Sequence, residues 1–167
     1  ITSSLHDLDL PLTTAYALYQ KLEKKRHERG VLDFDLAECR MDLDEKGHPV
    51  RVSPAKRYES HRLIEEFMIA ANTAVAKTLR EARALSLYRV HEAPEIGALE
   101  EINGLMKSLG LSLMLQDTSP GAFARVLAGT RHHRGSQTIH KTILRAQKRA
   151  VYENLPKGHF GLALRDY

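Results

Sequence analysis

A helical pattern runs from Glu59 to Ala84 and is the longest helix that the sequence predicts. On a helical wheel at about 100° per residue, its apolar side chains gather on one broad face, which is the expected core stripe. These side chains are Leu63, Ile64, Phe67, Ala71, Ala74 and Val75. Similar patterns predict further helices over residues 12–29, 94–110, 119–129 and 136–153. The sequence therefore predicts a fold in which helices dominate.

Strand patterns are fewer and shorter. Residues 31–35, VLDFD, alternate between apolar and acidic side chains, which is typical of a strand. The segments ECRMDLD and PVRVS flank a loop that contains Gly47, and this arrangement predicts a β-hairpin. Residues 85–90, LSLYRV, predict one more short strand. The fold class expected from these patterns is α+β.

Two adjacent glutamates interrupt the apolar pattern of the long helix. Glu66 falls opposite the expected core stripe, four residues after Arg62, and is predicted to form a weak surface ion pair with it. Glu65 lies on the same stripe as Asn72, with Ile69 on its flank, so its carboxylate needs hydrogen-bond partners. Glu65 could tie down the backbone N–H groups of a neighbouring loop. Alternatively, Glu65 and Asn72 line a groove and bind a polar ligand, such as the 2′-hydroxyl of a ribose.

Composition narrows the function classes. The chain has 167 residues, enough for one domain, with 43% hydrophobic and 28% charged residues. The sequence has no apolar run of the roughly 18 residues that a membrane helix needs and no secretory-signal pattern, so no membrane contact is predicted. The lone Cys39 excludes an internal disulfide and fits a reducing, cytoplasmic location. A net charge of +4 permits a polyanionic partner.

Four motifs together resemble one known family. They are similar, in order and spacing, to catalytic-domain motifs of the ribonuclease II and ribonuclease R (RNB) exoribonucleases. The four motifs are RGVLDFDLAE, RLIEEFMIAAN, LYRVHEAP and GHFGLALRDY. The similarity covers residues 12–167. The family degrades single-stranded RNA processively from the 3′ end with Mg²⁺, so the resemblance implies an RNB-type catalytic domain and a single-stranded RNA partner.

The resemblance also implies roles for individual residues. Phe34 corresponds to the aromatic residue that stacks on a base near the RNA 3′ end, which binds any base without reading its identity. Glu65 corresponds to the glutamate that contacts the ribose, although a shift of one position would select Glu66. His159 and Tyr167 lie in the segment that leads to the active-site floor. Each of these residues could instead be purely structural.

Basic residues after position 140 form a further candidate RNA contact. Lys148 and Arg149 fall mostly off the apolar face of the helix predicted over residues 136–153, where they would face solvent or attract the RNA backbone. The segment RHHR at 131–134 is predicted to be a polar connector and not a metal site, because no acidic side chains occur at the spacing that metal ligands need. His91 reads as a hydrogen-bonded structural residue at the end of a strand.

The chain departs from the family pattern in its metal site. The family holds Mg²⁺ with four aspartates upstream of the position that corresponds to residue 12, and HDLDL at 6–10 lacks their dense spacing. The serine-proline-isoleucine-arginine segment and the flanking RNA-binding barrels are also missing. With a start at Ile1 and a stop directly after GHFGLALRDY, residues 1–167 are predicted to be part of a catalytic domain that contacts the rest of a longer polypeptide. The alternatives are an inactive RNA-binding scaffold and a helical protein-interaction domain.

Overall fold

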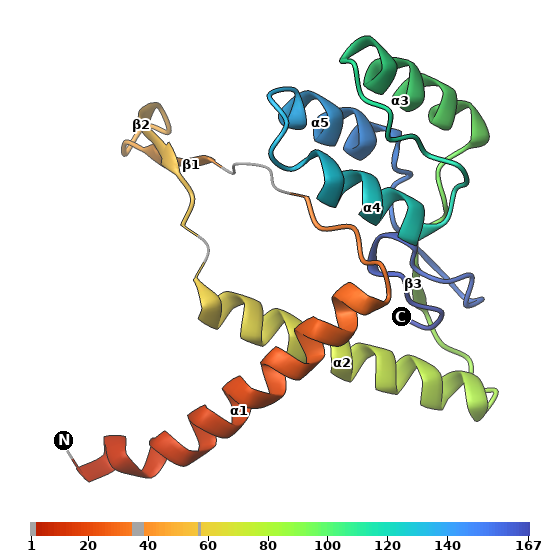
Figure 1. Ribbon diagram of the computed structural model, residues 1–167. Coiled ribbons are helices and arrows are strands. Elements are labelled where there is room, and N and C mark those ends of the chain that lie inside the picture. The colour runs from red at the N-terminus through yellow and green to blue at the C-terminus, as the bar shows by residue number, and fades with distance from the viewer. Residues whose placement is uncertain (1–2, 35–38, 57) are drawn as a thin grey trace.

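The computed structural model has an α+β architecture in which helices dominate, as the sequence predicts (Figure 1). It describes residues 3–34, 39–56 and 58–167, without the side chains of residues 3–8, which include Asp7. The elements in chain order are α1 (Ser3–Glu28), β1 (Cys39–Leu43), β2 (Pro49–Pro54), α2 (Glu59–Glu81), β3 (Tyr88–Val90), α3 (Ile96–Ser108), α4 (Pro120–Thr130), α5 (Ser136–Ala146), β4 (Val151–Glu153) and a short 3₁₀ helix (Phe160–Leu162).

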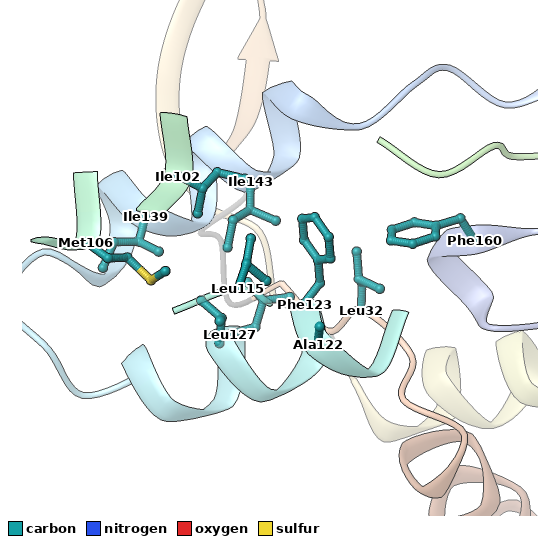
Figure 2. Packing of buried hydrophobic residues seen from close by; sticks show 11 residues of the cluster. Leu32, Ile102, Met106, Leu115, Ala122, Phe123, Leu127, Ile139, Ile143 and Phe160 are labelled. Atoms are coloured by element: carbon teal, nitrogen blue, oxygen red, sulfur yellow. The ribbon is translucent and has the colours of Figure 1, made fainter. Parts of the chain in front are cut away.

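The main hydrophobic core lies among α3, α4 and α5 (Figure 2). Its fully buried side chains come from all three helices: Ile102, Met106, Phe123, Val126, Ile139 and Ile143. Two side chains from distant parts of the chain complete it, Leu32 after α1 and Phe160 near the C-terminus. The core therefore anchors both segments that carry candidate functional residues.

Local signals place the ends of these helices close to where the sequence predicts them. Ser119 caps α4, because its side chain accepts a hydrogen bond from the backbone N–H of Ala122 at 3.3 Å. Pro120 follows at the first helical position, where the missing N–H costs nothing. Gly110, with a φ of +76°, follows α3 and ends it as expected.

The helices α1 and α2 cross each other beside this core (Figure 1). The start of α1 differs from the prediction, since the helix begins at Ser3 and continues through Pro11. Within α1, Tyr19 is buried and Leu12 is exposed. No helix within the described residues is both long and apolar enough to span a membrane.

The predicted core face of α2 is wrong. Ile64 is 65% exposed and Val75 is 58% exposed, whereas Glu66, Ile69 and Ala76 are buried. The reason is that α1 packs against the face that contains Glu66, and an arginine of α1 neutralises the buried carboxylate. A hydropathy pattern places every glutamate in solvent, because the pattern contains no information about a partner on another helix.

The predicted β-hairpin is confirmed. β1 and β2 pair antiparallel, with Met41 opposite Val52. In the turn, the Asp44 carboxylate accepts hydrogen bonds from the backbone N–H groups of Lys46 and His48, both at 2.8 Å. These bonds lower the pKa of Asp44. The strand predicted over residues 31–35 is not formed at residues 31–34, where Val31 and Leu32 are both buried, and its last residue lies outside the described residues.

A second two-stranded sheet joins distant parts of the chain. β3, which the sequence predicts, pairs antiparallel with β4, so that Val90 lies opposite Val151. The prediction of a helix over residues 136–153 is therefore wrong beyond Ala146. The backbone of Gln147 is extended, and the strand that follows gains backbone hydrogen bonds from β3 that local periodicity does not register.

Candidate nucleic-acid interface

Phe34 lines a groove of about 810 Å³ between the C-terminal end of α1 and α4. Its ring is half-buried and packs partly against the main core. The other lining side chains that carry charge or can acquire it are Glu23, His27, Asp33, Arg62, Arg131 and His132. The groove thus combines one aromatic ring with several ionisable groups.

A tight turn brings Phe34 to this position. Gly30 has a φ of +83°, which L side chains rarely adopt, and a Cβ there would lie 3.0 Å from the Cα of Gly121. The end of α1 therefore abuts the start of α4. Beyond the turn, the backbone N–H of Leu32 donates to the carbonyl of Gly161 at 3.2 Å, which ties the segment to the C-terminal region.

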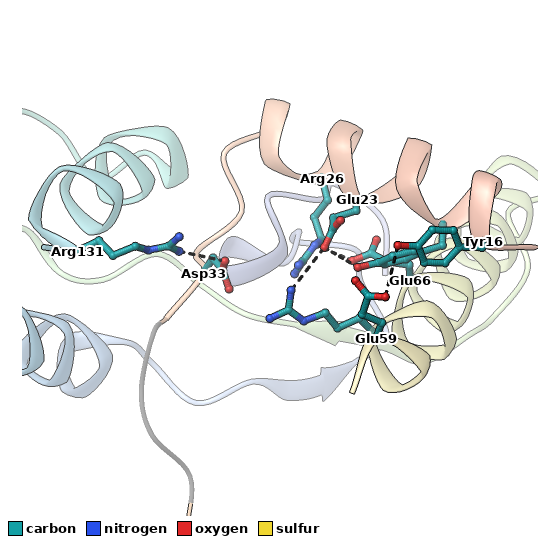
Figure 3. A network of polar contacts seen from close by, with 9 residues as sticks. Tyr16, Glu23, Arg26, Asp33, Glu59, Glu66 and Arg131 are labelled. Carbon is teal, nitrogen blue, oxygen red and sulfur yellow. Dashed lines mark hydrogen bonds and ion pairs between the residues drawn. The ribbon is translucent and has the colours of Figure 1, made fainter. Parts of the chain in front are cut away.

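Acidic residues balance the two arginines of the groove. Arg131 lies 3.5 Å from Asp33 (Figure 3), and Arg62 lies 4.0 Å from Glu23. These ion pairs are partly exposed and hold the guanidinium groups in place more than they stabilise the fold. With the histidines neutral, the groove has no excess of positive charge, so binding there depends on the aromatic ring more than on attraction to phosphate.

Of the two adjacent glutamates of α2, Glu66 is buried and not exposed as predicted. Glu66 is only 4% exposed, and its Oε1 lies 2.6 Å from the Nε of Arg26 on α1 (Figure 3). Burial raises the pKa of Glu66, and the positive charge of Arg26 opposes that shift. Glu65 is half-buried. The predicted surface pair of Arg62 with Glu66 is wrong, because Arg62 lies against Glu23 instead.

Three of the predicted residues meet at the C-terminal segment. The Asn72 side-chain amide donates to the Tyr167 hydroxyl at 3.4 Å. The Tyr167 ring stands edge-on to the His159 ring, with 5.2 Å between the centroids. The backbone N–H of Arg89 in β3 donates to the Tyr167 carbonyl at 2.8 Å. Asn72 and Tyr167 line a groove of about 580 Å³, which is separate from the one that contains Phe34.

An ion pair that sequence reasoning missed holds this segment to α2. The Nε of Arg80 donates to Oδ1 of the buried Asp166 at 2.7 Å, and this bond raises the pKa of Arg80. Arg80 follows Ala76 by four residues on the buried stripe of α2. This four-residue spacing could have indicated that Arg80 faces the core, but only if the burial of Ala76 had been known.

Lys148 and Arg149 lie after α5 and not on it. The Nζ of Lys148 is 3.3 Å from Glu92 and 3.6 Å from Glu95, so two carboxylates already contact this amine. Arg149 is exposed and forms no ion pair within the part of the chain that the structure describes. Of the two, Arg149 is the better placed to contact a phosphate.

Comparison with known proteins decides the family. The RNB domain model matches residues 2–167. The chain belongs to the RNB domain family. Its sequence is 37% identical over 158 residues to ribonuclease R of Aquifex aeolicus, covering 94% of this chain and 22% of that protein. It is 31% identical over 157 residues to ribonuclease R of Escherichia coli, covering 93% of this chain and 19% of that protein.

Solved structures agree with this RNB fold. Mycoplasma genitalium RNase R in complex with ribose methylated single-stranded RNA superposes with a TM-score of 0.86 at 23% identity, covering 93% of this chain and 25% of that one. The same enzyme has been solved with double-stranded RNA, and it superposes with a TM-score of 0.84 at 23% identity, covering 93% of this chain and 28% of that one. The chain thus spans about a fifth of the length of the curated relatives it matches, with shares of 22% and 19%.

Of the remaining candidate residues of this RNB chain, two histidines accept hydrogen bonds from backbone N–H groups. The prediction for His91 is confirmed, because its Nδ1 accepts a hydrogen bond from the backbone N–H of Gly161 at 3.1 Å. In the RHHR connector, Nδ1 of His133 accepts from the backbone N–H of Gly135 at 3.0 Å. Cys39 is an exposed free thiol. Among the described residues, no three His, Cys, Asp or Glu side chains are grouped closely enough to hold a metal ion.

The burial of His159 makes the stability of the chain depend on pH. Burial, with a smaller contribution from His91, lowers the pKa of His159 from its usual 6.5 to about 4. As the pH falls from 6.5 toward 4, His159 therefore becomes protonated in the unfolded chain while it stays neutral in the folded chain. We expect this histidine to reduce the free energy of unfolding by about 1–2 kcal/mol across that window, after allowance for its partial exposure, and to leave it unaffected above pH 6.5.

The measurement is urea unfolding at several pH values between 4 and 7 for the wild type and for His159→Asn. The asparagine oxygen can replace Nδ1 as acceptor for the backbone N–H of Leu162, which lies 3.3 Å away. The variant should lose stability less steeply on acidification. Identical pH slopes for the two proteins would contradict the assignment.

Proposed function

We propose that this chain is part of a 3′-to-5′ exoribonuclease that hydrolyses single-stranded RNA processively, and that it forms one wall of the RNA path. The observation that carries the proposal is the position of Phe34, whose ring lines a groove in a chain of the RNB family. Its relatives are named ribonuclease R, and a protein of the same fold has been solved with single-stranded RNA. These names support the activity for a longer protein of which this chain would be a part.

In this proposal, Phe34 stacks on a base and Glu65 accepts a hydrogen bond from a ribose hydroxyl. A half-buried carboxylate can accept a 2′-hydroxyl proton, and this contact would distinguish RNA from DNA. Glu66 is unsuitable, because it is buried against Arg26. Arg149 and Asn72 are exposed and are proposed as backbone contacts, whereas Lys148 would first have to leave Glu92 and Glu95.

Mg²⁺ is proposed as the cofactor of the longer protein, with ligands outside this chain. Two-metal hydrolysis of a phosphodiester needs several carboxylates around both ions. The acidic residues that the structure describes do not form such a group. The donor set of the described residues therefore does not fit the ion. A cytoplasmic location is proposed from the free thiol of Cys39 and the family resemblance.

The exposed apolar face of α2 favours an additional contact with protein. Ile64, Met68 and Val75 lie on this helix and are each more than half exposed. Exposed apolar side chains at helical spacing suit contact with another protein surface. We propose that the remainder of the longer polypeptide covers them, which agrees with the partner predicted from the sequence.

The test of the RNA wall is the replacement of Phe34. Phe34→Leu removes the flat ring but keeps apolar volume against the core, and it should weaken binding of single-stranded RNA by about 5- to 100-fold, since stacking contributes roughly 1–3 kcal/mol per base. Phe34→Tyr keeps the ring and should bind almost as the wild type does. Binding is measured by fluorescence anisotropy with a labelled oligonucleotide at two salt concentrations, and circular dichroism checks the fold.

Nuclease assays with 5′-labelled RNA, Mg²⁺ and an EDTA control accompany the binding measurement. We expect salt-sensitive RNA binding without shortening of the RNA, because the acidic side chains that the structure describes form no group that could hold a metal ion. Equal affinities for Phe34→Leu and Phe34→Tyr, or no RNA binding at all, would refute the proposed wall.

A further inference from the structure

A second cavity of about 510 Å³ lies where the C-terminal end of α1, the start of α4 and the C-terminal segment meet. In Figure 1, the end of α1, the start of α4 and the C-terminal segment lie close together near β3. Three basic side chains line it: Arg29, Lys157 and Arg165. Glu92 is the one acidic side chain among its lining residues. Unlike the groove with Phe34, this cavity carries an excess of positive charge.

Ion pairs leave two of these charges uncompensated. The Nζ of Lys157 lies 2.6 Å from Glu153, and Glu92 lies 3.3 Å from Lys148, so each of these charges is already matched. Among the described residues, neither Arg29 nor Arg165 forms an ion pair with a carboxylate, although the positive charge of Arg29 is close enough to Glu66 to oppose the rise in its pKa. Two unmatched guanidinium groups at one cavity are a strong signal for an anion, because an anion would supply the missing partner for both.

The backbone on either side of the cavity is held in place. Arg29 precedes Gly30, whose turn presses against the backbone of Gly121 at the start of α4. Arg165 follows a closed loop in which the N–H of His159 donates to the carbonyl of Leu164 at 2.7 Å and the reverse bond is 3.2 Å. Both arginines therefore extend from fixed backbone, which reduces the entropy lost when they bind a ligand.

The start of α4 adds to the positive potential. Pro120, the first residue of this 11-residue helix, lines the cavity. The helix dipole gives such a terminus a partial positive charge, although Pro120 has no N–H and the N–H of Ala122 already donates to Ser119. The donors to a phosphate oxygen therefore come from the two arginines, whose planar guanidinium fork suits the bidentate recognition of phosphate.

We propose that this cavity binds a phosphate group through Arg29 and Arg165. The phosphate can belong to the RNA backbone or to a free phosphorylated small molecule, and the same two side chains would bind either. The RNA case rests on the proposed function, whereas the small-molecule case does not. Both arginines lie within motifs that carry the family resemblance, RGVLDFDLAE and GHFGLALRDY, but the resemblance assigned neither of them a role. Neither lines the groove with Phe34.

The test compares Arg29→Ala, Arg165→Ala and the double variant with Arg51→Ala. Arg51 is an exposed arginine of the hairpin, so its removal lowers the net charge by the same one unit as each single variant without touching the cavity. Isothermal titration calorimetry at low ionic strength measures the binding of inorganic phosphate, 5′-AMP and a single-stranded oligonucleotide. Each single variant should bind its ligand about tenfold more weakly, as expected for the loss of one charge-assisted contact.

The three ligands separate the possible sources. Weaker binding of phosphate and 5′-AMP with unchanged RNA binding would identify a small-molecule site, and weaker RNA binding would identify the RNA backbone as the source. A wild type that binds phosphate but no RNA would refute the proposed wall and leave the cavity proposal intact. The cavity proposal is overturned if the double variant binds none of the three more weakly than Arg51→Ala does.

Discussion

Glu66→Ala is expected to lower the free energy of unfolding by about 3–5 kcal/mol, the cost of leaving a buried charge without its partner. The Arg26 side chain is 11% exposed, and its Nε lies 2.6 Å from Glu66, so removal of the carboxylate strands a guanidinium group between α1 and α2. Urea unfolding followed by circular dichroism at pH 7 measures the loss.

Two further variants make this prediction specific. Glu65→Ala removes the neighbouring carboxylate, which is half-buried, and should cost clearly less than Glu66→Ala. The double variant Arg26→Met with Glu66→Leu replaces both charges by apolar groups and should recover most of the stability, because the buried charge is then gone. Equal losses for the two glutamate variants would show that the buried pair does not hold the helices together.

Phe123→Ala is expected to cost about 3–5 kcal/mol, as is typical of a large side chain deleted from a packed core. Phe123 is fully buried among α3, α4 and α5, and its ring stands edge-on to that of Phe160 with 5.5 Å between the centroids (Figure 2). The cavity left behind would border Phe160 and loosen the C-terminal segment, so its amide hydrogens should also exchange faster.

Phe123→Leu is the matched control, since it keeps most of the volume and loses only the ring contact. It should cost no more than about half as much as the alanine variant. Hydrogen exchange at residues 158–167, measured by mass spectrometry, reports whether the segment is loosened. An alanine variant that is destabilised without faster exchange there would show that Phe160 is held independently of Phe123.

The parts of the fold that depend on local chemistry could be predicted from the sequence. Ser119 and Pro120 specify the start of α4 because capping needs only neighbouring atoms. Gly47 and the surrounding polar residues specify the hairpin turn for the same reason. The resemblance extended these predictions to an RNB fold, which the comparisons confirm.

The parts that depend on distant partners could not be predicted. Glu66 was assigned to solvent because Arg26, its partner, lies on another helix. The helical periodicity of α5 continues through Ala150, but the chain leaves the helix after Ala146 to pair with β3. In both cases a contact across the fold outweighs the local pattern.

In the candidate site, too, single residues could be predicted from the sequence, but the contacts between them could not. Asn72 and Tyr167 were each singled out from the sequence, yet the hydrogen bond between them spans 95 residues and no spacing rule predicts it. The bond between Arg80 and Asp166 spans 86 residues and was missed altogether. Phe34 lines one groove, whereas Asn72 and Tyr167 line a different one.

The pairing of β3 with β4 also sets a waiting time during synthesis. Val90 pairs with Val151, so about 60 residues must be translated before the first strand meets its partner. At roughly 5–20 residues per second, this delay is about 3–12 s, far longer than the microseconds in which α2 can form. Throughout that interval the nascent chain presents an unpaired strand edge next to Val90. Variants that slow translation between residues 91 and 150 should therefore aggregate more during expression than the same protein does when refolded at high dilution.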